Sequence, residues 1–194
     1  MEKHRLLAMT DGVVAIIITI MVLELKAPHG TDIGALTEQW PVFLAYAFSF
    51  AYVAIYWNNH HHYFHLVRRV NGAVLWANFA LLFWLSLVPF ATAWAGEHEF
   101  APVPTAVYGV SLFMPALAWR VLQELVIRAD GGRSHSALAA LLGRDAKGAI
   151  SPLIYVAGIG LSFVAPWMAM LCYFTVALLW VVPDRRIERM AEHG

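Results

Sequence analysis

Residues 5–25 read RLLAMTDGVVAIIITIMVLEL, and this stretch decides the fold class. From Gly12 to Leu23 the run is apolar on every helical face except at Thr19. A helix needs roughly 20 mostly apolar residues to cross the hydrocarbon core of a bilayer. A signal peptide would be shorter and would end in a small-x-small cleavage site, which this run lacks. We therefore interpret the stretch as a retained membrane-spanning helix.

The rest of the 194-residue chain has the same character. Hydrophobic residues make up 60% of it and charged residues 13%, whereas an average soluble domain carries roughly 25% charged residues. A soluble globule of 21.6 kDa could not bury this much hydrocarbon, so the surrounding solvent is expected to be largely lipid. The formal net charge of zero gives no indication of a nucleic-acid partner.

The same length criterion, applied along the chain, predicts six spans separated by charged or Pro/Gly-rich breaks. They are approximately residues 6–25, 40–64, 71–95, 103–127, 149–165 and 167–183. What remains is too short for a second domain, so residues 1–194 are expected to form one all-α membrane domain of six helices.

The Lys and Arg residues predict the orientation of these spans. With six spans both termini lie on one side, and nearly all the Lys and Arg residues fall in the termini and loops of that side. The opposite side holds Lys26 alone, and Arg120 lies within the fourth span. Because cytoplasmic loops carry an excess of positive charge, both termini are predicted to be cytoplasmic.

Polar side chains at membrane depth form a second pattern. An Asp at the centre of a membrane helix costs roughly 2.5–3.5 kcal/mol on insertion scales, so Asp11 is expected near the interface or beside a partner. The second helix ends, and the third begins, on the same side as Asp11. We therefore predict a hydrogen-bonded network that ties three helix ends together. Its candidate members are Arg5, Thr10, Asp11, Asn59, His60 and Asn78. The alternative is that each of these side chains reaches the lipid head groups independently.

A run of histidines at the end of the second span raises the question of a metal site. His61 and His65 are four residues apart and could hold a divalent metal with one more ligand, as could His60 with Asp11. Histidines at an interface are more often ordinary surface residues, and the chain offers no second set of ligands. We predict no metal site, no other cofactor and no enzymatic activity. A metal-binding membrane protein that uses residues 60–65 stays open as an alternative.

Two further spacings concern helix packing. Arg120 and Glu124 lie four residues apart, which favours an ion pair on one helix. Gly158 and Ser162 have the small-x-x-x-small spacing of close helix contacts. The glycines at 158 and 160 lack the flanking residues of a potassium selectivity loop built from backbone carbonyls.

The first helix itself has one stripe with spacings of three and four residues. The stripe contains Gly12, Ile16, either Thr19 or Ile20, and Leu23. Such a face packs in a protein core, faces lipid or lines a hydrophobic constriction. Periodicity alone cannot choose among the three.

Three short motifs carry a family resemblance. Arg5-Leu6-Leu7-Ala8-Met9-Thr10-Asp11 and the β-branched run after it are similar to an Arg-x-x-x-Phe-Ser-Asp signature and the helix that follows that signature. Trp57-Asn58-Asn59-His60 is similar to a Trp-x-x-His motif, and Leu87-Val88-Pro89-Phe90 to a Pro-Phe motif at the end of a third helix. Together they resemble the transmembrane protein 175 potassium-channel family. Met9 and Thr10 depart from its Phe-Ser pair, although Thr keeps the hydroxyl.

The resemblance implies a channel that is selective for potassium over sodium, with K⁺ as the permeant ion. Bacterial members are single six-helix chains that assemble as homotetramers, so the expected location is the inner membrane of a bacterial cell. Four first helices would line the pore. Carried over by position, Ile16, Ile20 and Leu23 would form an aliphatic constriction, with Thr19 as a ring of hydroxyl groups. Arg5, Asp11 and His60 would belong to a structural or gating network.

A small secondary transporter is the other alternative. Such a protein would need broken helices and a charged site near the membrane midplane. The chain offers prolines within its predicted spans, but its charges lie towards the cytoplasmic ends. The channel interpretation is therefore preferred.

Overall fold

The computed structural model describes residues 3–133, 138–139 and 146–181. Within these ranges every regular secondary-structure element is a helix. The helices are α1 (Lys3–Leu23), the short α2 (Ile33–Thr37), α3 (Trp40–Leu66), α4 (Gly72–Ser86), α5 (Val88–Glu97), α6 (Pro102–Ala129), α8 (Ala146–Leu161) and α9 (Pro166–Val181). The chain termini and the last two residues of the sixth predicted span lie outside the described residues.

Helices occupy all six of the segments predicted to span the membrane, but their lengths differ. Four helical segments are long and apolar enough to cross a bilayer: Lys3–Leu23, Trp40–Leu66, Gly72–Glu97 and Pro102–Ala129. In the described part of the chain, α8 and α9 are 16 residues each, which at a rise of about 1.5 Å per residue is about 24 Å. The hydrocarbon core is about 30 Å thick, so length alone does not establish these two as spans. The six-span count remains a prediction.

The third predicted span is divided at Leu87 into α4 and α5. The cause is Pro89, which sits at the start of α5. Proline has no N–H to donate to the preceding turn, and its ring clashes with the carbonyl four residues back. The two parts nevertheless form one apolar segment, Gly72–Glu97.

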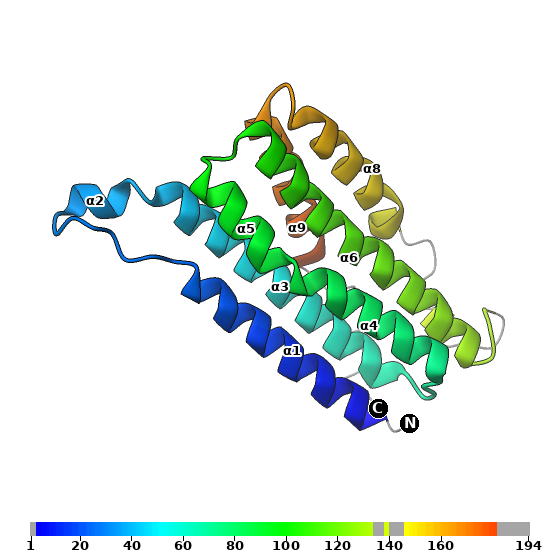
Figure 1. Cartoon of the computed structure of the whole chain (residues 1–194). Helices are drawn as coiled ribbons and strands as arrows, with labels where there is room; N and C mark the ends of the chain where they lie inside the picture. Colours follow the sequence, from blue (N-terminus) through cyan, green and yellow to red (C-terminus); the bar gives the residue numbers. More distant parts are fainter. Residues whose placement is uncertain (1–2, 134–137, 140–145, 182–194) are drawn as a thin grey trace.

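The long helices pack side by side in an antiparallel bundle, with α1 at one edge and α8 at the other (Figure 1). Helix α1 contacts α3, α4 and α5, whereas α8 packs on α6 and α9. The start of α1, the end of α3 and the start of α4 lie at the same end of the bundle (Figure 1). This arrangement brings the polar candidates of the first three predicted spans to a common level.

Buried hydroxyl groups join the helices inside the bundle. The Ser49 and Tyr108 hydroxyls are 2.6 Å apart, and the Thr92 hydroxyl donates to Ser49 Oγ at 2.7 Å. This chain links α3, α5 and α6. Among the described residues no buried side-chain nitrogen or oxygen lacks a hydrogen-bond partner. Full pairing is what a lipid environment demands, because no water is available there to pair a polar group.

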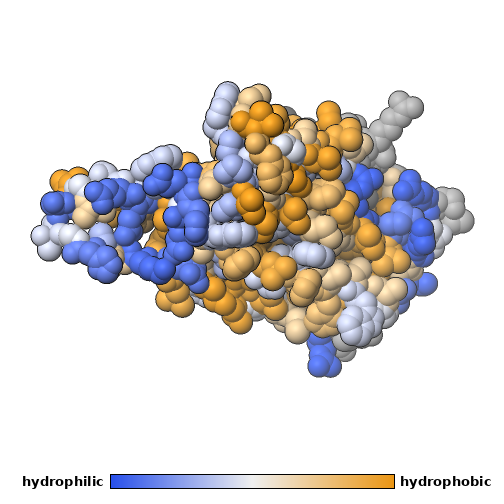
Figure 2. All heavy atoms as spheres, turned by 45° about the horizontal axis from the view of Figure 1, so that its top comes forward, coloured by the Kyte–Doolittle hydropathy of each residue, from blue (hydrophilic) through white to orange (hydrophobic). Residues whose placement is uncertain are grey.

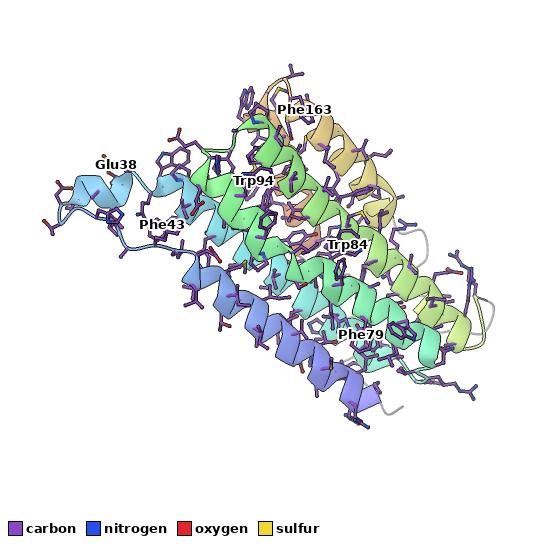
Figure 3. The ribbon with its side chains drawn as sticks, in the orientation of Figure 1. Glu38, Phe43, Phe79, Trp84, Trp94 and Phe163 are labelled. Carbon is purple, nitrogen blue, oxygen red and sulfur yellow. The ribbon has the colours of Figure 1, made fainter. Side chains whose placement is uncertain are left out.

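The outer surface of the bundle is apolar. Figure 2 shows hydrophobic residues over the helical body and hydrophilic residues gathered towards its ends. Large side chains such as Trp76, at 74% exposure, and Val164, at 85%, face outward. Aromatic side chains occur along the whole bundle, from Phe163 at the α8–α9 turn through Trp94 on α5 to Phe79 on α4 (Figure 3). A soluble monomer does not expose a continuous apolar belt, so the chain is an integral membrane protein.

The link between α1 and α3 is tied to the end of α5. Lys26 Nζ and Glu97 Oε1 form an ion pair at 2.6 Å. The hydrogen bond to Glu97, followed by its negative charge, raises the pKa of Lys26 above its ordinary value. The pair is therefore intact at neutral pH, and its contribution is lost as the pH rises through the raised pKa of Lys26.

The ion pair predicted between Arg120 and Glu124 is wrong. Glu124 instead pairs with Arg128 at 3.1 Å and with Arg133 at 2.9 Å. Arg120 donates to the carbonyl of Gly148, at the start of α8. Both alternative cations lie nearer the end of α6 and the loop beyond it, where water solvates the charged side chains more readily than at the level of Arg120.

Gly158 permits the close contact between α8 and α9. A Cβ at this position would lie 2.6 Å from Tyr173 Cε1 and 3.1 Å from Cys172 Cβ, whereas one at Gly160 would meet nothing within 4 Å. We expect Gly158→Ala to lower the free energy of unfolding by about 1–3 kcal/mol, because overpacking forces Tyr173 to move. Thermal unfolding in detergent measures this effect.

The matched control is Gly160→Ala, two residues away on the same helix. It should leave stability unchanged or raise it by up to about 1 kcal/mol, because Ala is the better helix former. If both substitutions lowered the free energy of unfolding equally, the α8–α9 contact would not be the cause of the loss at Gly158.

Candidate functional site

Helix α1 has two apolar faces with different surroundings. One face is buried against α3, α4 and α5, and it consists of Leu6, Thr10, Val14, Ile17 and Met21. A second face is exposed in the single chain. Ile16 is 58% exposed, Ile20 42% and Leu23 77%. The residues predicted to line a pore thus share the face of α1 that its own chain leaves uncovered.

Thr19 is exposed on the same helix. Its hydroxyl donates to the carbonyl of Ile16 at 2.9 Å, within α1. A hydroxyl that donates to its own helix keeps acceptor capacity on its oxygen. Thr19 can therefore offer an oxygen to a cation without giving up that hydrogen bond.

Three of the predicted network residues form one buried chain of hydrogen bonds. His60 Nε2 lies 2.8 Å from Asn78 Oδ1, Asn78 Nδ2 donates to Thr10 Oγ1 at 3.0 Å, and the Thr10 hydroxyl donates to the Leu6 carbonyl at 3.0 Å. An amide oxygen only accepts, so His60 donates from Nε2. All donors then point the same way, from α3 through α4 to α1.

The His60 ring also packs against aromatic side chains. It stacks on Phe64 with ring centroids 4.3 Å apart and lies 6.0 Å from Trp119 of α6. His60, Asn78 and Thr10 are each at most 2% exposed. The hydrogen-bonded chain is therefore dry, and each of its members depends on the next for a partner.

The other three network candidates are placed differently. Asp11 is exposed and accepts a hydrogen bond at 2.8 Å from the indole N–H of Trp57. Asn59 donates to the carbonyls of Ile55 at 2.9 Å and Trp180 at 3.3 Å, which joins α3 to α9. Arg5 is exposed at the start of α1. The structure brings Thr10, His60 and Asn78 together and leaves Arg5, Asp11 and Asn59 outside that chain.

Trp57 is the residue that sequence reasoning missed. It appears in the Trp-x-x-His motif, but no role was predicted for it. The signal was available, because an indole N–H at membrane depth needs an acceptor and the Asp11 carboxylate lies at that level. The contact gives α1 and α3 a second polar link beside the buried chain.

A cavity of about 40 Å³ lies elsewhere in the bundle, between α3, α6, α8 and α9. Its walls include the aromatic residues Tyr52, Trp119 and Tyr155, and none of its lining residues comes from α1. Its size suits a water molecule or a short apolar group rather than a path across the membrane. We therefore place the candidate functional site on α1 and at its contact with α3 and α4.

Comparisons with known proteins agree on one family. The family model described as "Endosomal/lysosomal potassium channel TMEM175" matches residues 5–89. A protein of Chryseobacterium sp. (strain P1-3), named a potassium channel, is 52% identical over 189 residues, which is 97% of each chain. Another so named, from Chamaesiphon minutus, is 32% identical over 93% of this chain and 94% of its own.

A solved structure agrees with this likeness. The crystal structure of a lysosomal potassium-selective channel TMEM175 homolog from Chamaesiphon minutus superposes with a TM-score of 0.79 at 30% sequence identity. The match covers 92% of this chain and 96% of the other. The likeness therefore extends over nearly the whole bundle, including the helices that follow the segment matched by the family model.

Proposed function

Because this chain belongs to the TMEM175 family, we propose that it is a K⁺-selective channel that conducts passively through a pore lined by α1. The observation that carries the proposal is the uncovered apolar face of α1, which is distinct from the face that packs on α3, α4 and α5. Relatives named as potassium channels support the choice of ion. The expected location is the bacterial inner membrane, since the relatives that match along the whole chain are bacterial.

The proposed constriction consists of Ile16, Ile20 and Leu23. These residues lie on one face of α1, and seven residues of helix span about 10 Å along the axis. An aliphatic throat of this kind resists wetting, so a small displacement of the helices can switch conduction. Selectivity in this proposal does not use a ring of backbone carbonyls. The Thr19 oxygens would face a partly dehydrated ion between the Ile16 and Leu23 layers.

We propose a homotetramer as the conducting form. One chain offers a single pore-facing helix, and a ring of identical helices around a symmetry axis encloses a path that one helix cannot. The exposure of Ile16 and Leu23 in the single chain supports a further partner on that face. Four copies of this chain, lipid and K⁺ are the partners that the proposal requires, and it needs no cofactor.

The orientation proposed for the channel has both termini in the cytoplasm. At the bundle end where α1 begins and α3 ends, the described residues include Lys3, Arg5, Arg68 and Arg69. On the opposite side Lys26 is the one Lys or Arg residue with a described position, and it pairs with Glu97. This asymmetry follows the excess of positive charge in cytoplasmic loops.

The network residues are proposed to be structural. The buried chain of His60, Asn78 and Thr10 would hold the cytoplasmic half of α1 on α3 and α4, so that the pore face keeps its direction. Asp11 and Asn59 would add separate links through Trp57 and Trp180. Arg5 supplies a permanent positive charge at the same level and would repel K⁺ there.

Ion flux through the purified protein tests the function. Reconstituted into liposomes loaded with K⁺, it should give a K⁺ flux that is greater than the Na⁺ flux under a matched gradient. A transporter would instead show saturation and dependence on a second, coupled ion. Flux that needs such a coupled ion, or equal Na⁺ and K⁺ flux, would contradict the proposal.

Particle mass tests the assembly separately. Native mass spectrometry in detergent should give a species of four chains of 21.6 kDa each. Covalent crosslinking in membranes should give the same state, since it does not depend on detergent. A monomer that conducts by itself would contradict the proposed pore.

A further inference from the structure

The histidines that follow His60 on α3 form a close pair on the surface of the bundle. His61 Nε2 and His65 Nε2 lie 3.0 Å apart, with ring centroids separated by 4.5 Å and the rings nearly perpendicular. One of these nitrogens must carry a proton for the contact to be a hydrogen bond. The other nitrogen accepts that hydrogen bond with its lone pair.

We infer that His61 and His65 form a site for a divalent transition-metal ion, Zn²⁺ or Cu²⁺, at the contact between α3 and α1. Zn–N bonds are about 2.0–2.1 Å long, and two ligands at a tetrahedral angle are then about 3.3 Å apart. The observed 3.0 Å needs an adjustment of a few tenths of an ångström. The ring that carries its proton on Nε2 changes to the tautomer protonated on Nδ1, so both rings stay neutral and both Nε2 lone pairs bind the ion. Water supplies the remaining ligands.

The chemistry of the pair selects the class of ion. Neutral imidazole binds Zn²⁺ and Cu²⁺, whereas Mg²⁺ and Ca²⁺ prefer oxygen ligands. No group of three or more His, Cys, Asp or Glu side chains in the described part of the chain could hold a metal. The site therefore rests on two protein ligands, and its affinity depends on how well they are held in place.

Neighbouring groups hold the pair in place. Trp57 stacks on the His61 ring with centroids 5.5 Å apart, and its indole N–H donates to Asp11 of α1. Lys3 of α1 donates to the His65 carbonyl at 3.3 Å. Both ligands therefore belong to a turn of α3 that is fixed to α1 on two sides, and preorganisation of this kind strengthens binding. The Lys3 ammonium opposes a dication at this site, and the Asp11 carboxylate attracts it.

His60 and His62 are not part of this site. The Nε2 of His60 is buried and bonded to Asn78. The His62 ring meets the His61 ring edge-on, with ring centroids 5.9 Å apart. His61 Nε2 contacts His65 and not His62. His62→Ala is therefore a matched control on the same turn.

Calorimetric titration of the full chain without an affinity tag tests the site. With ZnCl₂ we expect one ion per chain, tighter binding of CuCl₂, and no heat of binding for MgCl₂. His61→Ala and His65→Ala should each weaken Zn²⁺ binding by at least about tenfold, since either change leaves a single ligand. The double variant should lose little more than either single one, because both residues hold the same ion.

Thermal unfolding supplies a second measurement. Zn²⁺ should raise the unfolding temperature of the unmodified chain and of His62→Ala, but not that of His65→Ala. His65 is exposed and its carbonyl stays available to Lys3 after the substitution, so this variant should fold even if His61→Ala does not. The inference is overturned if Zn²⁺ does not bind saturably or if His62→Ala loses as much Zn²⁺ affinity as His61→Ala or His65→Ala. It is also overturned if the double variant loses the sum of the two single losses in binding free energy. None of these results depends on ion flux, so they leave the channel proposal to its own test.

Discussion

Replacing Ile16 by Asn is expected to raise K⁺ flux in liposomes by about tenfold or more and to reduce the preference for K⁺ over Na⁺. Four Ile16 side chains at the axis of the proposed tetramer would exclude water, and the amide of Asn would hydrate the same level. Lowering the barrier by about 1.4 kcal/mol raises the rate tenfold. Flux of each ion under matched gradients, with the tetramer confirmed by native mass, measures the effect.

Ile17→Ala is the matched control, because Ile17 is the same residue type one position further along α1. Its side chain is 3% exposed and faces the bundle, whereas Ile16 is 58% exposed. We expect Ile17→Ala to lower the free energy of unfolding by roughly 2–5 kcal/mol through the cavity it leaves. The selectivity of whatever protein remains folded should not change. If Ile16→Asn left flux and selectivity unaltered, and substitutions at Ile20 and Leu23 did the same, α1 would not line the pore.

The contrast between Ile16 and Ile17 also shows what sequence patterns can predict. Residues 12–23 are apolar almost all round, so the sequence predicts a helix there but does not indicate which of its faces is packed. The direction of the packed face is decided by contacts with α3, α4 and α5, which are distant in sequence. The stripe of Gly12, Ile16 and Leu23 was visible in the spacing. That this stripe is exposed could be seen only in the structure.

The length criterion predicted the ends of the spans to within a few residues. It did not predict which prolines would interrupt a helix. The break at Leu87 follows from Pro89, yet prolines at 115 and 152 leave α6 and α8 unbroken. A proline in a membrane helix is tolerated when neighbouring groups pair the freed carbonyl. That pairing depends on tertiary contacts, so the same residue type ends one helix and not another.

The candidate network shows the same limit at the level of single atoms. Topology brought Thr10, His60 and Asn78 to one level, and the structure joins them through hydrogen bonds. Asn59 belongs to the same turn of α3 as His60, but adjacent residues point about 100° apart on a helix. Its amide therefore reaches Trp180 of α9 instead. Depth can be counted along a sequence, whereas the direction of a side chain around the bundle depends on which helices are neighbours.

Asn78→Leu is expected to cause the largest loss of stability among changes to polar residues of the buried contact. Leu has a similar shape but neither donates nor accepts. The His60 Nε2–H would lose its acceptor and the Thr10 oxygen its donor in a region where no member is more than 2% exposed. A buried polar group without a partner costs about 1–3 kcal/mol, so the two together predict a loss of roughly 2–6 kcal/mol. Thermal or denaturant unfolding in detergent measures it.

Asn58→Leu is the matched control for Asn78→Leu, because it makes the same substitution at a similar level of the bundle. Asn58 is half-buried on α3, and no side-chain hydrogen bond is found for it within the described part of the chain. We expect a change in unfolding free energy within about 0.5 kcal/mol, the usual range for substitutions that break no specific contact. If the hydrogen bonds of His60, Asn78 and Thr10 anchor α1, Asn78→Leu should also reduce the yield of tetramer, because the pore face of α1 loses its fixed direction. Unchanged stability and assembly in Asn78→Leu would show that the hydrogen-bonded chain contributes nothing that apolar packing at the same position cannot supply.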